Sequence, residues 1–217
     1  MILFDYFRSS AAYRVRIALN LKGLVAERRF VHLRKGEQRA PDYLEKNPQG
    51  FVPTLVVGPL HLTQSLAIIE YLDEKFPLPP LLPPGAEDRA FVRAIALAIA
   101  CDIHPLDNLR VLQYLYRQLA VEEPARDEWY RHWIREGFGA IESQLAARAT
   151  GPYCFGDTPT LADVCLVPQV ANARRFDCDL TAYPRLVAID AACRELKAFA
   201  DAAPEAQPDY PGDPARA

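Results

Sequence analysis

The chain has 217 residues, enough for one large domain or two modest ones. Half of its residues are hydrophobic, 24% are charged and the formal net charge is -3, which is typical of a globular protein and lacks the basic surplus of nucleic-acid binders. No basic segment leads into a sustained apolar run, so we expect a cytoplasmic protein without a signal peptide, a membrane span or a nucleic-acid partner.

The first 80 residues mix short apolar runs with amphipathic segments. Runs of strand length alternate with helical patterns, and a glycine–proline pair separates the last two runs as in a hairpin. We predict strands at 2–7, 28–33, 54–57 and 60–63, and helices at 12–22, 41–47 and 67–76. The resulting order is β-α-β-α-β-β-α, in which the first two strands form a parallel pair around a crossover helix.

The proline-rich segment 77–85 is the clearest boundary in the chain. Because proline lacks an amide donor and fixes φ, this segment suits neither a helix nor a central strand. We therefore predict a linker at 77–85, one domain at 1–80 and a second domain at 86–217.

The second domain is predicted to be all-helical, with helices at 88–119, 127–149, 160–176 and 183–202. Pro105 falls inside the first of these helices and should kink or end it. Thr160 and Asp163 have the spacing of a capping box, which predicts the start of the third helix. The tail after Pro204 is rich in proline and acidic residues, and we expect it to fray.

The five cysteines are odd in number, and no two of them have C-x-x-C spacing. Such a pattern favours neither a disulfide framework nor a zinc site. We expect mostly buried thiols in a reducing compartment, and no bound metal.

Two serines, Ser9 and Ser10, stand between the first predicted strand and the first predicted helix. A helix N-terminus exposes unpaired N–H groups and a positive partial charge, which stabilise a phosphate, a carboxylate or a thiolate. A serine hydroxyl at this place can donate one more hydrogen bond to the anion. The alternative, that both serines only cap the helix, fits the same residues.

Two further segments favour a peptide-like ligand. Val52-Pro53 directly precedes a predicted strand, where a cis bond would turn the Val52 backbone outward to pair with a peptide; an edge-strand proline without a ligand is the alternative. Gln64 and Ser65 open a predicted helix, and their side chains could hold an α-amino-acid carboxylate. An ordinary helix cap explains that pair as well.

Together these segments resemble the glutathione transferase superfamily, and most closely its zeta class. The resemblance runs from Leu3 to Pro208. Its most class-specific parts are Arg8-Ser-Ser, Tyr13 to Leu19, Gln64 to Tyr71, Asp102 to Asn108 and Ala162 to Phe176. The resemblance implies a thioredoxin-like N-terminal domain, an all-α C-terminal domain, glutathione as cofactor and a homodimer.

The resemblance also implies a role for single residues at the glutathione site. Ser9 would be the catalytic hydroxyl beside the glutathione sulfur, supported by Ser10, although Ala11 stands where the class usually has a cysteine. The implied glutathione contacts are Ser9, Gln38, Val52, Pro53, Gln64, Ser65, His104 and Asn108. The last two reach in from the helical domain, and packing beside Pro105 is the alternative for His104.

Two arginines are implied to bind an acidic substrate. Arg8 stands next to Ser9, and Arg175 lies near the end of the third helix of the second domain, where the class has a substrate-binding arginine. Arginine suits this role because its planar fork grips a carboxylate with two hydrogen bonds. Arg174 is expected to face solvent.

The implied reaction is the glutathione-dependent cis–trans isomerisation of a maleyl diketo acid, maleylacetoacetate to fumarylacetoacetate, in tyrosine and phenylalanine catabolism. Maleylpyruvate isomerisation in gentisate catabolism is an alternative, which Leu109 disfavours because a second arginine is expected there in those enzymes. A general conjugating transferase is another alternative. A non-catalytic interaction domain is disfavoured because a scaffold has no use for Ser9, Val52-Pro53 or Gln64-Ser65.

Overall fold

The computed structural model describes residues 1–148 and 151–212, and the chain divides into two compact units. The first unit joins residues 1–80 to the C-terminal segment that begins at residue 195. The second unit spans residues 81–194. Each unit has a hydrophobic core of its own residues, so each can be described by itself.

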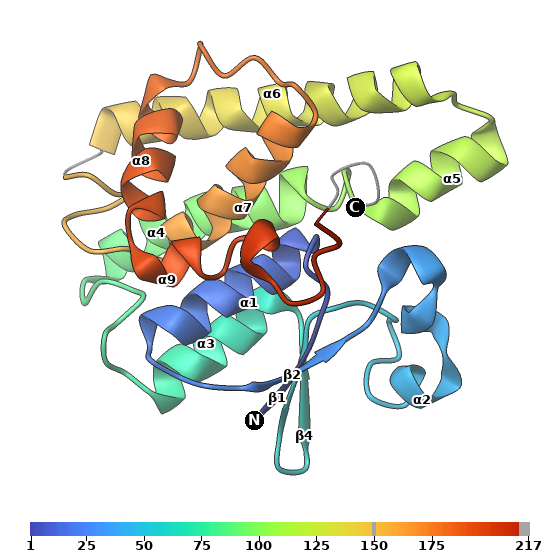
Figure 1. Cartoon of the computed structure of the whole chain (residues 1–217). Coiled ribbons are helices and arrows are strands. Elements are labelled where there is room, and N and C mark those ends of the chain that lie inside the picture. The colour runs from blue at the N-terminus through green and yellow to red at the C-terminus, as the bar shows by residue number, and fades with distance from the viewer. Residues whose placement is uncertain (149–150, 213–217) are drawn as a thin grey trace. The chain divides into compact units, whose positions relative to one another are not determined.

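The first unit contains a four-stranded mixed sheet of order β2-β1-β3-β4 (Figure 1). Its strands are β1 (Ile2–Asp5), β2 (Glu27–Phe30), β3 (Thr54–Val57) and β4 (Leu60–Thr63). The first strand pairs in parallel with β2 and antiparallel with β3, and β3 and β4 form an antiparallel hairpin. The predicted parallel pair and hairpin are confirmed, while β1 and β2 are shorter than predicted.

Three helices follow these strands in the predicted order: α1 (Ser10–Leu21), α2 (Pro41–Leu44) and α3 (Ser65–Lys75). Helix α1 packs against α3, and the side chains of Val15, Ile17, Ile68 and Leu72 are fully buried. Because most residues of α1 are buried, this helix lies at the centre of the unit. Its first residues, which follow β1 in the chain, therefore have a fixed position. That position matters because Ser9 directly precedes α1.

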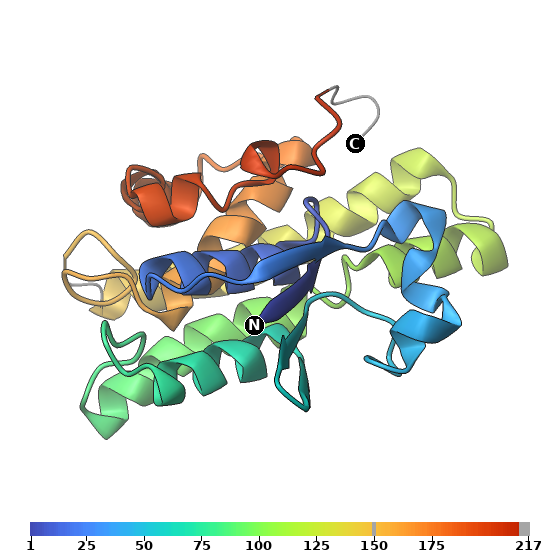
Figure 2. The ribbon, with the colours of Figure 1, turned by 60° about the horizontal axis from the view of Figure 1, so that its bottom comes forward.

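The C-terminal segment packs on α1, which lies between α3 and this segment (Figure 2). The segment contains α9 (Lys197–Ala200) and the short helix η4 (Pro204–Ala206). Its backbone carbonyls accept hydrogen bonds from Tyr13 (Oη to Phe199 O, 3.4 Å), Arg16 (Nε to Ala202 O, 2.8 Å) and Asn20 (Nδ2 to Ala198 O, 2.9 Å). The predicted domain boundaries placed the C-terminal segment in the helical domain, whereas these hydrogen bonds join the segment to the first unit.

Two predictions for this part of the chain are wrong. The single helix predicted at 183–202 is interrupted, because α8 (Pro184–Arg194) ends and Leu196 is extended, with φ -79° and ψ 128°, before α9 begins. The part of the tail after Pro204 that the structure describes, residues 205–212, is ordered rather than frayed. Gln207 is only 6% exposed, and its Nε2 donates to the carbonyls of Asp201 (2.9 Å) and Ala203 (2.7 Å).

The second unit is helical, as predicted. Its helices are α4 (Ala86–Leu97), η3 (Ala98–Ile103), α5 (Leu109–Leu119), α6 (Glu123–Arg148), α7 (Leu161–Arg175) and α8. Helix α7 is central: most of its residues are buried, and it packs against α4, α8 and η3. Among the residues that the structure describes, no helix is both long enough and apolar enough to cross a membrane.

The long helix predicted at 88–119 ends near Pro105, which is one of the two effects expected of this proline. After α4 the backbone winds more loosely as a π-helix, η3, in which the His104 N–H donates to Ile99 O at 2.9 Å. Pro105 has no N–H to continue the ladder, and a turn follows. Helix α5 then begins afresh, capped by Asn108, whose Oδ1 accepts from the Arg110 N–H at 3.1 Å.

Helix α6 approaches η3 closely, and a glycine makes this possible. A Cβ on Gly137 would lie 2.2 Å from the Ile103 side chain. The capping box predicted at the start of α7 is also present: Asp163 Oδ2 accepts from the Thr160 N–H at 2.7 Å and from Thr160 Oγ1 at 2.8 Å. These features fix η3, which His104 follows, and α7, which carries Arg175.

Candidate active site

A tight turn between β1 and α1 presents Ser9. The Ser9 N–H donates to Tyr6 O at 2.9 Å and closes the turn over Phe7 and Arg8. Ser9 is the N-cap of α1, with φ -72° and ψ 113°, and its Oγ accepts from the Ala12 N–H at 3.2 Å. The cap uses only the acceptor side of the hydroxyl, so its hydrogen is left for a donor bond to a ligand. Ser9 therefore does cap the helix, and capping does not exclude a ligand-binding role.

The start of α1 has the charge that an anion needs. A twelve-residue helix concentrates a partial positive charge at its N-terminus, and no acidic residue in the first turn of α1 offsets it. Ser9 and Arg8 are partly exposed, whereas Ser10 is 7% exposed. Ser9 thus lies where an anion can reach both its hydroxyl and the helix end.

The loop before β3 offers a second set of ligand groups. The Val52–Pro53 bond is cis, one of the two conformations considered for its position before a strand. The loop is held by Asn47, whose Nδ2 donates to Phe51 O at 2.8 Å, and by Tyr43, whose hydroxyl donates to the same oxygen at 2.5 Å. Within the described residues, the N–H and C=O of Val52 make no hydrogen bond. A backbone with both groups available suits pairing with a peptide.

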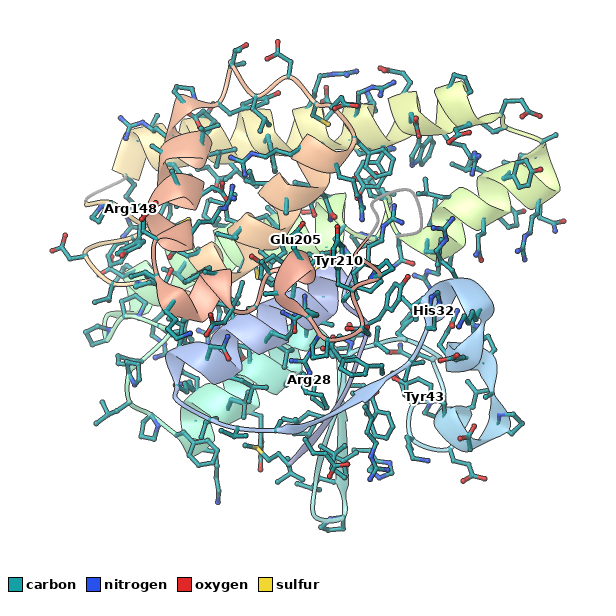
Figure 3. The ribbon with its side chains drawn as sticks, viewed as in Figure 1. Arg28, His32, Tyr43, Arg148, Glu205 and Tyr210 are labelled. Atoms are coloured by element: carbon teal, nitrogen blue, oxygen red, sulfur yellow. The ribbon has the colours of Figure 1, made fainter. Side chains whose placement is uncertain are left out.

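The turn of Ser9 and the loop of Val52 belong to one hydrophobic cluster. Its buried members are Phe4, Tyr6, Phe7, Val31, Tyr43 and Val52. Tyr43, which is labelled in Figure 3, belongs to α2, and its ring meets the Phe4 ring edge-on at 5.6 Å between centroids. Because the cluster includes both Phe7 and Val52, the two candidate ligand-binding segments are fixed relative to each other.

Gln64 has an unusual backbone conformation at the start of α3. Its φ is 67° and its ψ 118°, a left-handed value that costs free energy for a residue with a side chain. Its Nε2 donates to Gln49 Oε1 at 2.8 Å. Ser65 follows, 7% exposed, and its Oγ accepts from Arg14 Nη1 at 3.4 Å. A strained residue at a helix N-terminus beside a buried guanidinium is typical of a site that binds a carboxylate.

Gln38 lies beside the loop that precedes Val52. It belongs to the short helix η2 (Glu37–Arg39), and its backbone oxygen would lie 2.9 Å from a Cβ at Gly50. Gly50 has φ 63°, so its lack of a side chain serves both the turn and this close approach. Gln38 Oε1 is buried without a hydrogen-bond partner in the described residues. The site therefore contains a polar atom that a ligand could satisfy.

In the second unit, Arg175 stands at the end of α7 in a polar and aromatic setting. Its Nη2 donates to Asn172 Oδ1 at 3.1 Å and to Tyr130 Oη at 3.4 Å. Its guanidinium also lies 5.1 Å from the centre of the Phe176 ring, and that ring stacks on Tyr130 at 3.6 Å. Burial raises the pKa of Tyr130, so its hydroxyl stays protonated. The arginine is exposed and oriented, as binding of an external anion requires.

Asp107 is the main residue near Arg175 that the sequence analysis missed. Its residue is 6% exposed, and neither carboxylate oxygen has a hydrogen-bond partner among the described residues. Burial raises the pKa of Asp107 to about 8, although the nearby charge of Arg175 lowers it in part. No sequence signal reveals this, because the shift arises from residues that the fold brings together.

Comparison with known proteins identifies the family. The N-terminal domain of glutathione S-transferase matches residues 1–74, and its C-terminal domain matches residues 123–202. The chain belongs to the glutathione S-transferase family. The predicted fold class, a thioredoxin-like domain followed by an all-α domain, is thereby confirmed.

Similar proteins place this glutathione S-transferase close to the zeta class. A probable maleylacetoacetate isomerase of Vibrio cholerae is 55% identical and covers 96% of this chain and 98% of its own. A holo structure of maleyl pyruvate isomerase, described as a bacterial zeta-class enzyme, is 51% identical with a TM-score of 0.95, covering 96% of this chain and 99% of its own. Maleylacetoacetate isomerase of Methylobacterium extorquens AM1, solved with malonate and glutathione, is 40% identical with a TM-score of 0.94, covering 97% and 100%. The zeta-class resemblance is confirmed.

The predicted site residues of this transferase divide between the two units. The first unit holds Arg8, Ser9, Ser10, Gln38, Val52, Pro53, Gln64 and Ser65, and the second holds His104, Asn108 and Arg175. In the second unit, His104 directly follows η3 and is partly buried, and the Asn108 side chain caps α5. Arg174 is exposed as expected, but its Nη1 also binds Asp190 Oδ2 at 2.5 Å, an acid that is 1% exposed.

Proposed function

We propose that this chain is a glutathione-dependent cis–trans isomerase of a maleyl diketo acid, with maleylacetoacetate as substrate and fumarylacetoacetate as product. The observation that carries the proposal is the Ser9 hydroxyl, which caps α1 through its oxygen and keeps its hydrogen for a ligand. The similarity to zeta-class isomerases supports the reaction type. We also propose that the protein is cytoplasmic and acts as a homodimer, by analogy with its family.

The first unit fits glutathione at several points. The available backbone of Val52 suits pairing with the cysteinyl peptide group, next to Pro53. The strained Gln64 and the buried Ser65 suit the γ-glutamyl carboxylate, and the unsatisfied Oε1 of Gln38 suits the glycyl end as an acceptor for its N–H. In the second unit, we expect His104 and Asn108 to contribute further contacts.

The mechanism needs a thiolate at neutral pH. When bound, glutathione supplies a thiolate that adds to the cis double bond, allows rotation about the resulting single bond, and leaves unchanged. Ser9 donates a hydrogen bond to the sulfur anion, and the N-terminal charge of α1 stabilises the same anion, so the thiol pKa falls. Ser10, the first residue of α1, supports Ser9.

The substrate is a diacid, and two arginines are suited to it. Arg175 binds a carboxylate with its guanidinium, which Asn172 and Tyr130 hold in place. Arg8 adds a second positive charge beside Ser9, where negative charge develops on the enolate oxygen. These residues bind and orient the diacid, while Ser9 acts on the sulfur.

Maleylpyruvate is the second candidate substrate, because a relative of 51% identity is named for that reaction. Leu109, at the start of α5, favours maleylacetoacetate. An assay of both substrates, with and without glutathione, decides between them. Turnover of maleylacetoacetate that requires glutathione is the expected result. Faster turnover of maleylpyruvate would reassign the substrate.

A non-catalytic role is tested separately with immobilised glutathione. The isomerase should bind the resin and elute with free glutathione, whereas a scaffold of the same fold should pass through. Retention on the resin combined with no turnover of either maleyl acid would leave a general conjugating transferase as the function.

A further inference from the structure

The C-terminal segment reaches the turn that presents Ser9. Asp209 Oδ2 accepts a hydrogen bond from the Phe7 N–H at 2.9 Å, although 202 positions separate these residues in the sequence. The ring of Tyr210 meets the Phe7 ring edge-on, with 5.6 Å between the centroids and an angle of 77°. Tyr210, which is labelled in Figure 3, also packs against the cluster that contains Val52. Asp209 and Tyr210 of the C-terminal segment therefore contact Phe7, two residues before Ser9.

Arg16 holds Phe7 from the opposite side, at its carbonyl. This arginine is 2% exposed, and its Nη2 donates to Phe7 O at 3.0 Å while Nη1 donates to Tyr6 O at 3.4 Å. Its Nε donates to Ala202 O at 2.8 Å, on the C-terminal segment. The turn and the segment are thus joined by one rigid guanidinium as well as by Asp209.

Further charges hold the segment and the turn together. Arg16 forms an ion pair with the fully buried Asp5 at 2.9 Å, and Arg28 contacts the other oxygen of that carboxylate. Arg28 Nη2 also donates to Gln207 Oε1 at 3.0 Å. Burial lowers the pKa of Arg16 to about 10, and the negative charge of Asp209 opposes this shift. Two arginines and two acids therefore form a balanced, largely buried group beneath the turn.

We propose that the C-terminal residues Gln207 to Tyr210 belong to the catalytic apparatus, and that Asp209 is a positioning residue for Ser9. Asp209 holds the N–H of Phe7 while Arg16 holds its carbonyl, so the orientation of the turn is fixed from both sides. The Ser9 N–H bonds to Tyr6 O in the same turn, and the direction of the Ser9 hydroxyl follows from it. Misplacement of a catalytic group by a fraction of an ångström is enough to lower a rate.

This inference rests on the proposed function of Ser9, and its test measures the thiol of bound glutathione directly. The absorbance of the thiolate in the ultraviolet, followed as pH is raised, gives the thiol pKa in the complex. Asp209→Ala removes the acceptor of the Phe7 N–H, so the thiol pKa should rise and kcat should fall about tenfold. The KM for glutathione should change less, because no contact residue for the tripeptide is altered.

Two variants separate positioning from a general loss of stability. Asp209→Asn keeps an oxygen where the Phe7 N–H donates, so it should restore most of kcat and the thiol pKa. Asp201→Ala is the matched control, because the side chain of this tail acid is exposed and pairs with Lys197 on the surface, at 2.5 Å. The control should match the wild type in both quantities. If Asp209→Ala does not fold, Tyr210→Leu replaces it, with an expected shift of the thiol pKa in the same direction.

The outcomes distinguish this inference from the proposed function. The inference alone would be overturned if Ser9→Ala raises the thiol pKa and Asp209→Ala leaves it unchanged. Where Tyr210→Leu replaces Asp209→Ala, an unchanged thiol pKa in Tyr210→Leu has the same meaning. The inference would also be overturned if Asp209→Ala and Asp209→Asn lose kcat equally and this loss follows a drop in melting temperature. If the wild-type protein binds no glutathione, or if Ser9→Ala leaves the thiol pKa unchanged, the proposed function fails first and the inference fails with it.

Discussion

Asp107→Asn should make the second unit more stable at neutral pH. Burial raises the pKa of Asp107 to about 8, from an ordinary value of 3.8, and both carboxylate oxygens lack a hydrogen-bond partner in the described residues. Between these two values the folded chain keeps a proton that the unfolded chain has lost. The free energy of unfolding of the wild type must therefore fall as pH rises through this window.

The magnitude follows from the width of the window. Each pH unit inside it lowers the free energy of unfolding by about 1.4 kcal/mol, so the change from about pH 5 to about pH 7.5 is about 3 kcal/mol. The amide that replaces the carboxyl group in the variant cannot ionise, so the variant lacks this slope. Arg175, Tyr130 and Cys178 are the titratable groups that interact with Asp107, and they are present in both proteins, so the difference between the two isolates Asp107.

Urea unfolding at several pH values measures this difference. Both tryptophans, Trp129 and Trp133, lie in α6, so their fluorescence reports the unit that contains Asp107. The advantage of the variant over the wild type should grow by about 3 kcal/mol across the window. Asp102→Asn, on the exposed side of the same segment, controls for the loss of one negative charge. A difference that stays constant with pH would refute the argument from burial.

Three further predictions concern single residues. Ser9→Ala should lower kcat more than Ser10→Ala does; equal mild effects in steady-state assays would mean that the helix dipole performs most of the activation. Arg175→Ala should raise the KM for the diacid about tenfold, or about 1.4 kcal/mol, and leave glutathione binding intact, while Arg185→Ala on the surface of α8 changes neither; an unchanged KM would remove Arg175 from the site. Thr160→Val should lower the free energy of unfolding by about 1 kcal/mol without changing kcat, and equal stability in denaturant would show that the cap contributes nothing.

Much of the fold could be predicted because its signals are local. The hairpin strands were predicted at 54–57 and 60–63, and the structure has them at these residues, since two alternating runs and a glycine–proline turn lie within ten positions. The start of α7 was predicted from a hydroxyl and a carboxylate three residues apart. Ser9, Val52 and Gln64 were found in the same way, because helix caps and turns are marked by short motifs, whereas Gln38, His104 and Asn108 were implied only by the family resemblance.

What could not be predicted depends on contacts between distant residues. The positive φ of Gln64 has no sequence signal, because glutamine usually avoids it and the surrounding fold imposes it. The proline-rich tail has no hydrophobic pattern, so nothing marked Asp209 as the partner of Phe7. The π-helix before Pro105 also escaped prediction, since its apolar spacing resembles that of an ordinary helix.

The two kinds of binding proposed for this protein should differ in how they tolerate substitution. On the glutathione side, much of the work is assigned to the backbone: the end of α1, the groups of Val52 and the conformation of Gln64. Many side-chain substitutions leave such groups in place. On the diacid side, binding is assigned to the guanidinium of Arg175, whose charge interacts with the buried Asp107. Relatives named for maleylacetoacetate and for maleylpyruvate both exceed 50% identity to this chain, which is the pattern expected if a shared backbone site activates the thiol and a few side chains select the acid.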